Sequence, residues 1–445
     1  MKTIILSIIF SILLQWLFAK EVLGQKKDTV WTLQSCIQYA LQQNIQVQKS
    51  SLTNDINKVN ADQARESRFP SLNASASQNF SWSKPLGLDG KYSNYAGQNS
   101  SSFGINSNVT LYNGGKIRNS IKQADINYQA GQYDVETMKE SISLNILNAY
   151  LQILYAEEQV KNSEKQVEVT ADQLRLAEER VKLGSISNAD YLQVKSQLAS
   201  EKQTLANAQS TLDIDRVTLM QLMEIPVTPN FYIVHPEFNN LISTSRSSKA
   251  DSIYNIALGI KPQIKSADLN KQSAALAVDI AKAGYQPQLS LNGDISTGYN
   301  NSYGVAYDYQ VSNRITPSVG LTLSIPIYQN RQARSKVDIA KINTQNAELS
   351  ETDTKNQLRK AIEQACVDVS TAEKKFLASL EDYNANQESF EVASEKFNQG
   401  LLNSVDYLVQ KTNLITAESN LLQAKYNLIF SNKILDFYSG VPLTL

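Results

Sequence analysis

The sequence is poor in the residues that build metal centres and disulfide frameworks. Its 445 residues include one histidine and two cysteines. Cys36 and Cys366 lie far apart, each within a helical pattern, and we expect them to be ordinary core or helix-face residues. His235 stands beside Pro236 in a connector and is given no catalytic role. We therefore expect no metal site, no cofactor and no disulfide.

Catalytic groups and an excess of one charge are also lacking. The formal net charge is −1, and the 19% of charged residues are mixed in sign, which argues against a nucleic-acid surface. The chain has no glycine-rich nucleotide loop, so any driving energy has to come from other proteins. No polar constellation suited to a catalytic cleft is visible. The sequence therefore predicts that the protein is not an enzyme.

A long apolar run stands at the N-terminus. Residues 1–24 carry Lys2, an apolar stretch and a small-residue exit at 22–24, which is the layout of a cleaved secretory signal. The stretch is roughly 15 residues, shorter than the ~20 that a spanning helix needs. Gln25 stands where a bacterial lipoprotein has its acylated cysteine, so lipidation is not expected. The sequence predicts an exported protein, with an uncleaved anchor as the alternative.

The chain is an internal duplication. Gly184 and the Asp190-Tyr191-Leu192 motif recur as Gly400 and Asp406-Tyr407-Leu408, at an offset of 216 residues (400 − 184). The same offset relates Tyr112 to Tyr328 and Pro226 to Pro442. Self-similarity at a fixed period indicates repeated architecture. We assign repeat 1 to residues 25–225, a proline- and serine-rich linker or equatorial segment to 226–252, and repeat 2 to 253–445.

Four segments alternate apolar residues with small polar ones and are predicted to be strands, at about 71–83, 101–113, 287–299 and 316–328. Such alternation fits a sheet packed on a soluble core, or an outer-membrane barrel with its apolar face toward lipid. Tilted strands of ~9–11 residues cross a bilayer, and aromatic residues stand near the strand ends at Trp82, Tyr112, Tyr299 and Tyr328. Four strands cannot close a barrel, and a barrel in lipid must close. The pattern therefore favours a barrel to which several chains contribute strands.

The longest predicted elements are helices. No proline occurs from 115 to 183, and apolar residues recur there at alternating spacings of three and four, which is typical of a coiled-coil seam. About 70 residues at 1.5 Å each would give a rod of about 100 Å. The pattern resumes after each glycine. The sequence thus predicts two long helical hairpins with tips at Gly184 and Gly400.

The sequence resembles the TolC-type outer-membrane efflux proteins. The resemblance covers essentially the mature chain and is carried by these residues: Thr32-Leu33, Ala40-Leu41, Asn44, Phe69-Pro70-Ser71-Leu72, Leu111-Tyr112-Asn113-Gly114-Gly115 and the two Gly…Asp-Tyr-Leu turns. Each motif is short, and the specific feature is their order, duplicated at a constant offset.

The resemblance implies a mixed α and β membrane protein. In this family a homotrimer pools twelve strands into one barrel, continued by a coiled-coil helical tunnel through the periplasm. The resemblance also implies contact with outer-membrane lipid. It further implies docking of the tips onto a periplasmic adaptor, or membrane fusion protein, that joins an inner-membrane pump of the resistance-nodulation-division or ABC type. The docking residues would be Gly184, Ser185, Ile186, Ser187, Gly400, Leu401, Leu402 and Asn403.

The family narrows its tunnel near the tips with aspartates six and nine residues after the second glycine. Here these positions are Asp406 and Val409, so one of the two acidic rings is retained. The arginine that locks the closed state in family members would fall at Leu402. The resemblance therefore implies a pore constriction at Asp406, with Asp190 as its repeat counterpart, but not the usual latch.

Two roles fit these aspartates on physical grounds. Three carboxylates around a symmetric pore repel one another, which raises their pKa values and favours cations. Alternatively, Asp190 and Asp406 cap the helices that begin after each tip, where a carboxylate meets free N–H groups. The two roles are compatible.

The function expected from the whole pattern is a passive exit duct of a tripartite export system, located in the cell outer membrane with its helical tunnel in the periplasm. The alternative is a trimeric surface coiled coil with a structural or adhesive role. That alternative predicts a large region outside the cell, and the modest loops between the strands disfavour it. A shared duct can serve several pumps, so we expect selectivity for the exported substrate to lie in the pump and adaptor.

Overall fold

The computed structural model describes residues 30–84, 90–92, 94–236 and 250–444. The predicted signal peptide and the middle of the predicted linker lie outside these ranges. Helices predominate, together with one four-stranded sheet and one two-stranded sheet. Within the described residues, no helix is both long enough and apolar enough to cross a membrane.

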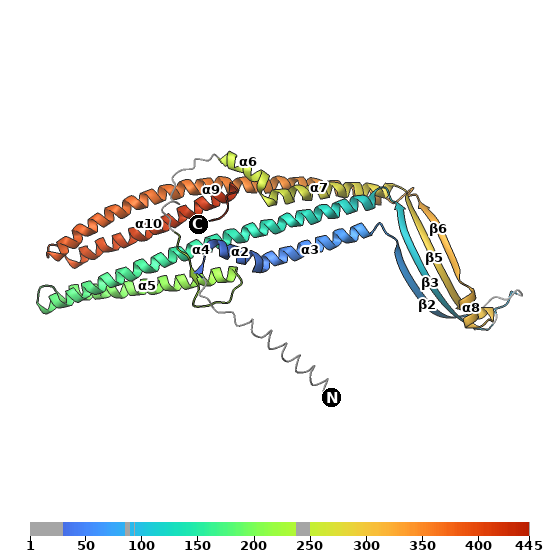
Figure 1. Cartoon of the computed structure of the whole chain (residues 1–445), viewed down its shortest axis with the longest axis horizontal. Coiled ribbons are helices and arrows are strands. Elements are labelled where there is room, and N and C mark those ends of the chain that lie inside the picture. The colour runs from blue at the N-terminus through green and yellow to red at the C-terminus, as the bar shows by residue number, and fades with distance from the viewer. Residues whose placement is uncertain (1–29, 85–89, 93, 237–249, 445) are drawn as a thin grey trace, which may run out of the picture. The chain divides into compact units, whose positions relative to one another are not determined.

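The elements follow one another as two similar halves (Figure 1). The first half contains β1 (Val30–Trp31), α2 (Leu33–Gln43), α3 (Ile45–Glu66), β2 (Ser71–Ser83), β3 (Ala96–Tyr112), α4 (Lys116–Lys182), α5 (Asn188–Leu222) and β4 (Tyr232–Ile233). The second half contains α6 (Ala250–Ile260), α7 (Pro262–Lys282), β5 (Gln288–Asn300), α8 (Tyr307–Asn313), β6 (Thr316–Ser324), α9 (Gln332–Asn398) and α10 (Ser404–Tyr438).

The chain divides into two compact units that cut across the sequence repeats. Unit 1 combines Met1–Val47, Lys139–Ala257 and Ala361–Leu445, and unit 2 combines Gln48–Met138 and Leu258–Lys360. α4 and α9 each contribute residues to both units. Each half of the sequence therefore supplies its two strands of the four-stranded sheet to unit 2 and its hairpin tip to unit 1.

The sheet of unit 2 is antiparallel, in the order β2-β3-β5-β6. Its register places Val109, Leu291 and Leu321 in one cross-strand row. The next row is polar, and there Asn108 Nδ2 donates to Asn292 Oδ1 at 2.5 Å. Successive side chains of a strand point to opposite faces, so one face of this sheet is apolar and the other carries small polar residues.

The helices of unit 2 are joined by polar contacts. Arg65 of α3 forms an ion pair with Asp125 of α4 at 2.6 Å. Ser273 of α7 donates from Oγ to Asn127 Oδ1 of α4 at 2.6 Å, and Lys271 of α7 pairs with Glu351 of α9 at 2.8 Å. The hydrogen bonds to Asp268 and Glu351 raise the pKa of Lys271.

Most of the largest fully buried side chains lie in unit 1. Its fully buried side chains include Tyr150, Ile153, Leu154, Leu219 and Met220. β1 and β4 form a short parallel pair, and the Tyr150 hydroxyl donates to the backbone oxygen of Val234 at 2.6 Å. Cys36 is fully buried, and burial raises the pKa of its thiol to about 12.

Three details of the strand region differ from the expectations. β3 begins at Ala96 rather than near residue 101, because the β2–β3 ladder continues to the pair Ser83 and Ala96. β6 ends at Ser324, two residues before Pro326, which has no N–H to donate to a ladder. The connection between β5 and β6, treated above as one of the modest loops between the strands, contains α8.

A glycine in the sheet gives a test of this register. A Cβ on Gly298 would lie 2.4 Å from the backbone oxygen of Ser101, whereas a Cβ on Gly320 would have nothing within 4 Å. We expect Gly298→Ala to lower the free energy of unfolding by about 1–3 kcal/mol, as overpacking does. Gly320→Ala is the matched control and should change it by less than about 0.5 kcal/mol.

The measurement is the unfolding midpoint of the purified protein in detergent, followed by circular dichroism. Equal midpoints for the two variants would show that β3 and β5 do not approach as closely at Gly298 as the register requires.

Candidate functional site

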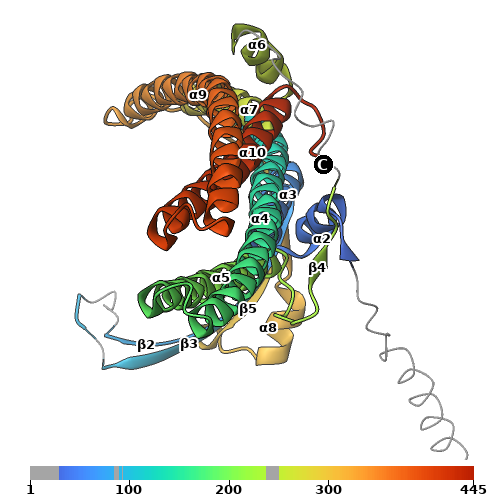
Figure 2. The ribbon, with the colours of Figure 1, turned by 90° about the vertical axis from the view of Figure 1, so that its left-hand side faces the viewer.

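Both predicted tips are tight turns that begin with a left-handed glycine. Gly184 has φ +70° and Gly400 has φ +74°. In each turn the N–H after the glycine donates to a carbonyl five residues back: Ser185 to Arg180 at 2.9 Å, and Leu401 to Lys396 at 2.8 Å. This bond pattern ends a helix while satisfying its last carbonyls. Figure 2 looks toward these tips of the α4–α5 and α9–α10 hairpins.

The helix after each turn is capped, at the first tip with the suggested aspartate and at the second by a neighbouring asparagine. Ser187 and Asp190 form a capping box at the start of α5. At the start of α10, the Asp406 N–H donates to Asn403 Oδ1 at 2.8 Å, and Asn403 Nδ2 donates to Asp406 Oδ2 at 2.9 Å. Side-chain acceptors at these positions satisfy the free N–H groups of the first turn. The Asp190 carboxylate therefore takes part in capping α5. At the start of α10 the capping acceptor is Asn403, and the Asp406 carboxylate accepts from the Asn403 side chain and, among the described residues, from no backbone N–H in that turn.

Asp190 also joins the two tips. The Ser404 hydroxyl of the second tip donates to Asp190 Oδ1 of the first. Hydrogen bonds from the Ser187 and Ser404 side chains lower the pKa of the Asp190 carboxyl, because they favour its ionised form. Asp406 is exposed and Asp190 is partly covered. The repeat counterparts thus have different surroundings.

An aromatic cluster supports the second tip from within unit 1. The Tyr407 ring lies between Phe397, at a centroid distance of 4.5 Å, and Phe390, at 5.5 Å. Gln173 of α4 donates to the Tyr407 hydroxyl. Burial raises the pKa of Tyr407 to about 12, so the hydroxyl stays protonated. The second tip is therefore tied to the first hairpin through the tyrosine of its Asp-Tyr-Leu motif.

The sequence analysis missed a buried ion pair between the hairpins. Lys411 Nζ of α10 lies 3.1 Å from Glu201 Oε1 of α5, and their side chains are 5% and 6% exposed. Thr170 of α4 donates to Glu201 and accepts from Lys411. Gln197 Nε2 donates to the same carboxylate at 3.0 Å. Burial lowers the pKa of the Lys411 ammonium, and the neighbouring Glu201 carboxylate opposes that effect.

A sequence signal for this pair exists. Lys411 lies four residues after Tyr407 and three before Leu414, and Glu201 lies three after Leu198. Both charges therefore interrupt a helical seam at the apolar spacing of three and four. A charge in such a position is almost never buried without a partner. A contact between Lys411 and Glu201 could therefore have been predicted from the sequence.

The tips expose large apolar side chains. Leu183 is 82% exposed and Leu401 is 73% exposed, and Val405 and Val409 are also exposed. Leu402 and Ile186 are partly covered. Leu402 and Val409 are apolar at the positions where the resemblance implies an arginine and an aspartate. The tips therefore present apolar as well as acidic groups.

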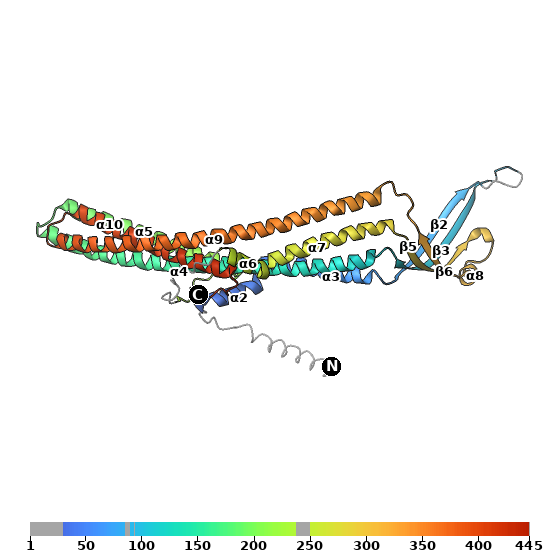
Figure 3. The ribbon, with the colours of Figure 1, turned by 90° about the horizontal axis from the view of Figure 1, so that it is seen from above.

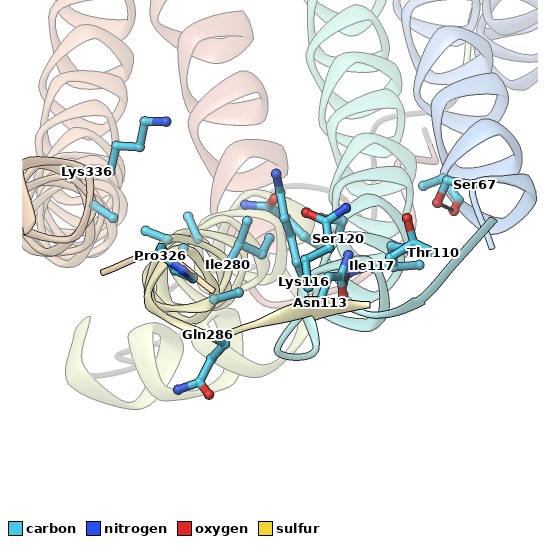
Figure 4. Close-up of a pocket in the computed structure, with 18 of the residues that line it drawn as sticks. Ser67, Thr110, Asn113, Lys116, Ile117, Ser120, Ile280, Gln286, Pro326 and Lys336 are labelled. Atoms are coloured by element: carbon cyan, nitrogen blue, oxygen red, sulfur yellow. Dashed lines mark hydrogen bonds between the residues drawn. The ribbon is translucent and has the colours of Figure 1, made fainter. Parts of the chain in front are cut away.

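Unit 2 contains a large hollow where the strands meet the helices (Figure 4). It has a volume of about 1070 Å³ and is lined by α3, α4, α7, α9 and the adjoining strand ends. Its polar lining consists of amides, hydroxyls and two lysines, Lys116 and Lys336, and none of its described lining residues is acidic. Within the described ranges no group of three or more acidic, histidine or cysteine residues could hold a metal ion. A lining of this kind is suited to contact with water.

Comparison with known proteins gives consistent matches. The family model described as outer membrane efflux protein matches residues 36–223 and 253–441. TolC of Escherichia coli (strain K12) is 26% identical over 208 residues, 46% of this chain and 42% of that protein. Nodulation protein T of Rhizobium leguminosarum bv. trifolii is 23% identical over 390 residues, 86% of this chain and 79% of that protein.

Among solved structures, CusC superposes with a TM-score of 0.80 at 19% identity, over 95% of this chain and 96% of that chain. The sequence match to TolC thus spans less than half of TolC, whereas the likeness of fold to CusC spans nearly all of both chains.

The buried pair yields a prediction for stability. Lys411→Met leaves the Glu201 carboxylate buried without its cation, so we expect a loss of about 3–5 kcal/mol in the free energy of unfolding. The double variant with Glu201→Gln should recover most of this loss, because it removes both charges. Lys195→Met is the matched control, since Lys195 is the exposed repeat counterpart of Lys411.

Thermal or denaturant unfolding of the four proteins provides the comparison. If the double variant were as unstable as Lys411→Met alone, the loss would come from packing and not from the unpaired charge.

Proposed function

The chain belongs to the outer membrane efflux protein family, and from this we infer that it is the passive exit duct of an export system. The family is one of channels, not enzymes, and its members lie in the outer membrane. The two matched segments, 36–223 and 253–441, support the proposed repeats 25–225 and 253–445. The predicted signal peptide at residues 1–24 would direct the export that a location in the outer membrane requires.

The observation that carries the proposal is the four-stranded sheet with two different faces and two open edges. Within the described residues, β2 and β6 each pair on one side only. Val319 and Leu321 of β6 are 81% and 66% exposed on the apolar face. Lipid tolerates such a face but not an unpaired edge. Three chains that pool twelve strands would cover both edges and enclose the polar face.

Apolar helix surfaces of unit 2 support the same homotrimer. Leu52, Ile56 and Val59 form an exposed stripe at helical spacing on α3. Ile339, Ile342 and Leu349 form a second exposed stripe on α9. Exposed apolar patches of this kind mark interaction sites. Contacts between neighbouring copies would bury both stripes and continue the barrel as a ring of helices around a lumen.

We propose that the two tips dock onto a periplasmic adaptor. The tip residues are Gly184, Ser185, Ile186, Ser187, Gly400, Leu401, Leu402 and Asn403. The exposed Leu183 and Leu401 side chains give these turns an apolar surface, and apolar anchors dominate the energy of most interfaces. The adaptor would connect the duct to an inner-membrane pump of the resistance-nodulation-division or ABC type, which supplies the energy.

The proposed pore constriction rests chiefly on Asp406. Its carboxylate is exposed and accepts a hydrogen bond from Asn403, so it remains open to ions. Asp190 belongs to the same proposal, but its bond from Ser404 leaves it less available. Three Asp406 carboxylates around a narrow axis would attract cations.

The first test is the oligomer mass and planar-bilayer conductance of one purified sample. We expect the mass of three chains and discrete, cation-selective current steps. A trimer that never conducts would contradict an open duct in the isolated protein, and a water-soluble monomer would contradict the barrel.

The role of Asp406 is tested in the same bilayers. We expect Asp406→Ala to weaken block by multivalent cations, because three negative charges leave the constriction. Asn403→Ala is the control, since it removes the hydrogen-bonding partner and keeps the carboxylate. Unchanged block in Asp406→Ala would exclude Asp406 from the constriction, and an equal effect in both variants would assign the change to capping.

Docking is tested by a photoreactive amino acid placed at Leu401 in living cells, with Lys374 in the exposed part of α9 as the control position. We expect Leu401 to give an adduct that mass spectrometry identifies as a periplasmic adaptor. Adducts with that protein from Lys374 alone would move the docking surface away from the tips.

A further inference from the structure

The connection between β5 and β6 is a folded cap rather than an open loop. We define this cap as residues 301–315, which include α8. The Gln310 side chain is 3% exposed, and its Nε2 donates to the backbone oxygens of Asn300 at 3.1 Å and Val305 at 2.8 Å. Its Oε1 accepts from the Asn300 N–H at 3.0 Å. A buried amide with these bonds fixes the conformation of the cap.

The cap lies over the apolar face of the sheet. Successive side chains of β5 point to opposite faces, so Thr297 and Tyr299 lie on the same face as Ile295, which is the apolar one. The Thr297 hydroxyl donates to the Val311 oxygen of α8 at 2.6 Å, and the Tyr299 and Tyr307 rings are 5.0 Å apart. Figures 1 and 3 both show α8 at the end of β5 that is remote from α7.

The cap presents tyrosines and one arginine around a hollow. Tyr303 and Tyr309 are each 61% exposed, and with Val305, Asn313 and Arg314 they line a space of about 330 Å³. The Arg314 guanidinium lies 4.8 Å from the Tyr303 ring centroid. One of its N–H groups, on Nη1, reaches Gln310 Oε1 at 3.4 Å. A guanidinium has five N–H donors and matches phosphate geometry.

We propose that this hollow binds the anionic, sugar-bearing headgroup of a lipid in the leaflet beside the barrel. The proposal rests on the proposed barrel, because it takes the apolar face to be in contact with lipid. The Tyr303 and Tyr309 rings pack against the sugar, and Arg314 binds its phosphate.

Position and chemistry both favour a lipid as the occupant. The cap that bears the hollow contacts Thr297 and Tyr299 on the face that exposes Ile295, Val319 and Leu321. In the proposed barrel that face is the outer one, so the occupant would lie beside the bilayer and not in the lumen. Tyrosine rings with a free polar tip are enriched at the boundary between apolar and polar layers. A phosphate complements the Arg314 charge, and a neutral headgroup does not.

The test uses the purified trimer in detergent and a lipid built on a phosphorylated disaccharide as the probe, with native mass spectrometry as the readout. We expect Arg314→Gln to weaken retention of this lipid by about tenfold, because a charged hydrogen bond is lost. Tyr309→Ala should also weaken it. Arg334→Gln is the matched control, since Arg334 is an exposed arginine at the start of α9, and it should leave retention unchanged.

Equal retention by the wild type and Arg314→Gln would overturn the proposal. Equal binding of the soluble sugar phosphate without acyl chains would overturn the choice of a lipid. Bilayer conductance of Arg314→Gln separates this proposal from the duct, because the pore should conduct normally whether or not the hollow binds lipid.

Discussion

The antiparallel register of the four-stranded sheet is the constraint on which most of the structure depends. A shift of one residue would move every side chain of a strand to the opposite face. The observed register keeps Val109, Leu291 and Leu321 on one face and Asn108, Asn292 and Gly320 on the other. In the proposed barrel, the apolar face contacts lipid, the polar face contacts water, and the edges of β2 and β6 pair with strands of other copies. The register of the strands thus determines which surroundings each face and each edge of the sheet requires.

The two hairpin tips show how a duplicated sequence acquires two turns with different surroundings. Both turns use a left-handed glycine and a capped helix start. Around them the copies differ. Asp190 accepts a hydrogen bond from Ser404 across the hairpins, whereas Asp406 remains exposed. The first tip is therefore hydrogen-bonded to the second, and in the proposed pore the second tip offers the exposed carboxylate.

Regular periodicity explains which parts of the fold could be predicted from sequence. The alternation of apolar and small polar residues indicated four strands, and the spacing of three and four indicated the long helices, because each pattern reflects one repeating geometry. The start of β3 was wrong by several residues because Gln98, Asn99 and Ser100 are typical of loops and become a strand only through pairing with β2. α8 was missed because tertiary bonds to Gln310 hold this short helix. Pairing and tertiary bonds leave little trace in local sequence.

Only those parts of the tip region that depend on neighbouring residues in the sequence could be predicted. Glycine turns and caps are local, so the tip residues could be placed from the sequence alone. The pair of Lys411 and Glu201 joins helices far apart in the chain. The lysine recurs in the first repeat as Lys195, but the counterpart of Glu201 is Ala417, so the repeat is broken at the glutamate. An apolar pair could pack there at less desolvation cost, whereas a buried charge pair tolerates few other alignments. The pair therefore selects one alignment of the two hairpins, and in the proposed duct that alignment sets how closely the exposed Asp406 carboxylates of three chains approach the axis.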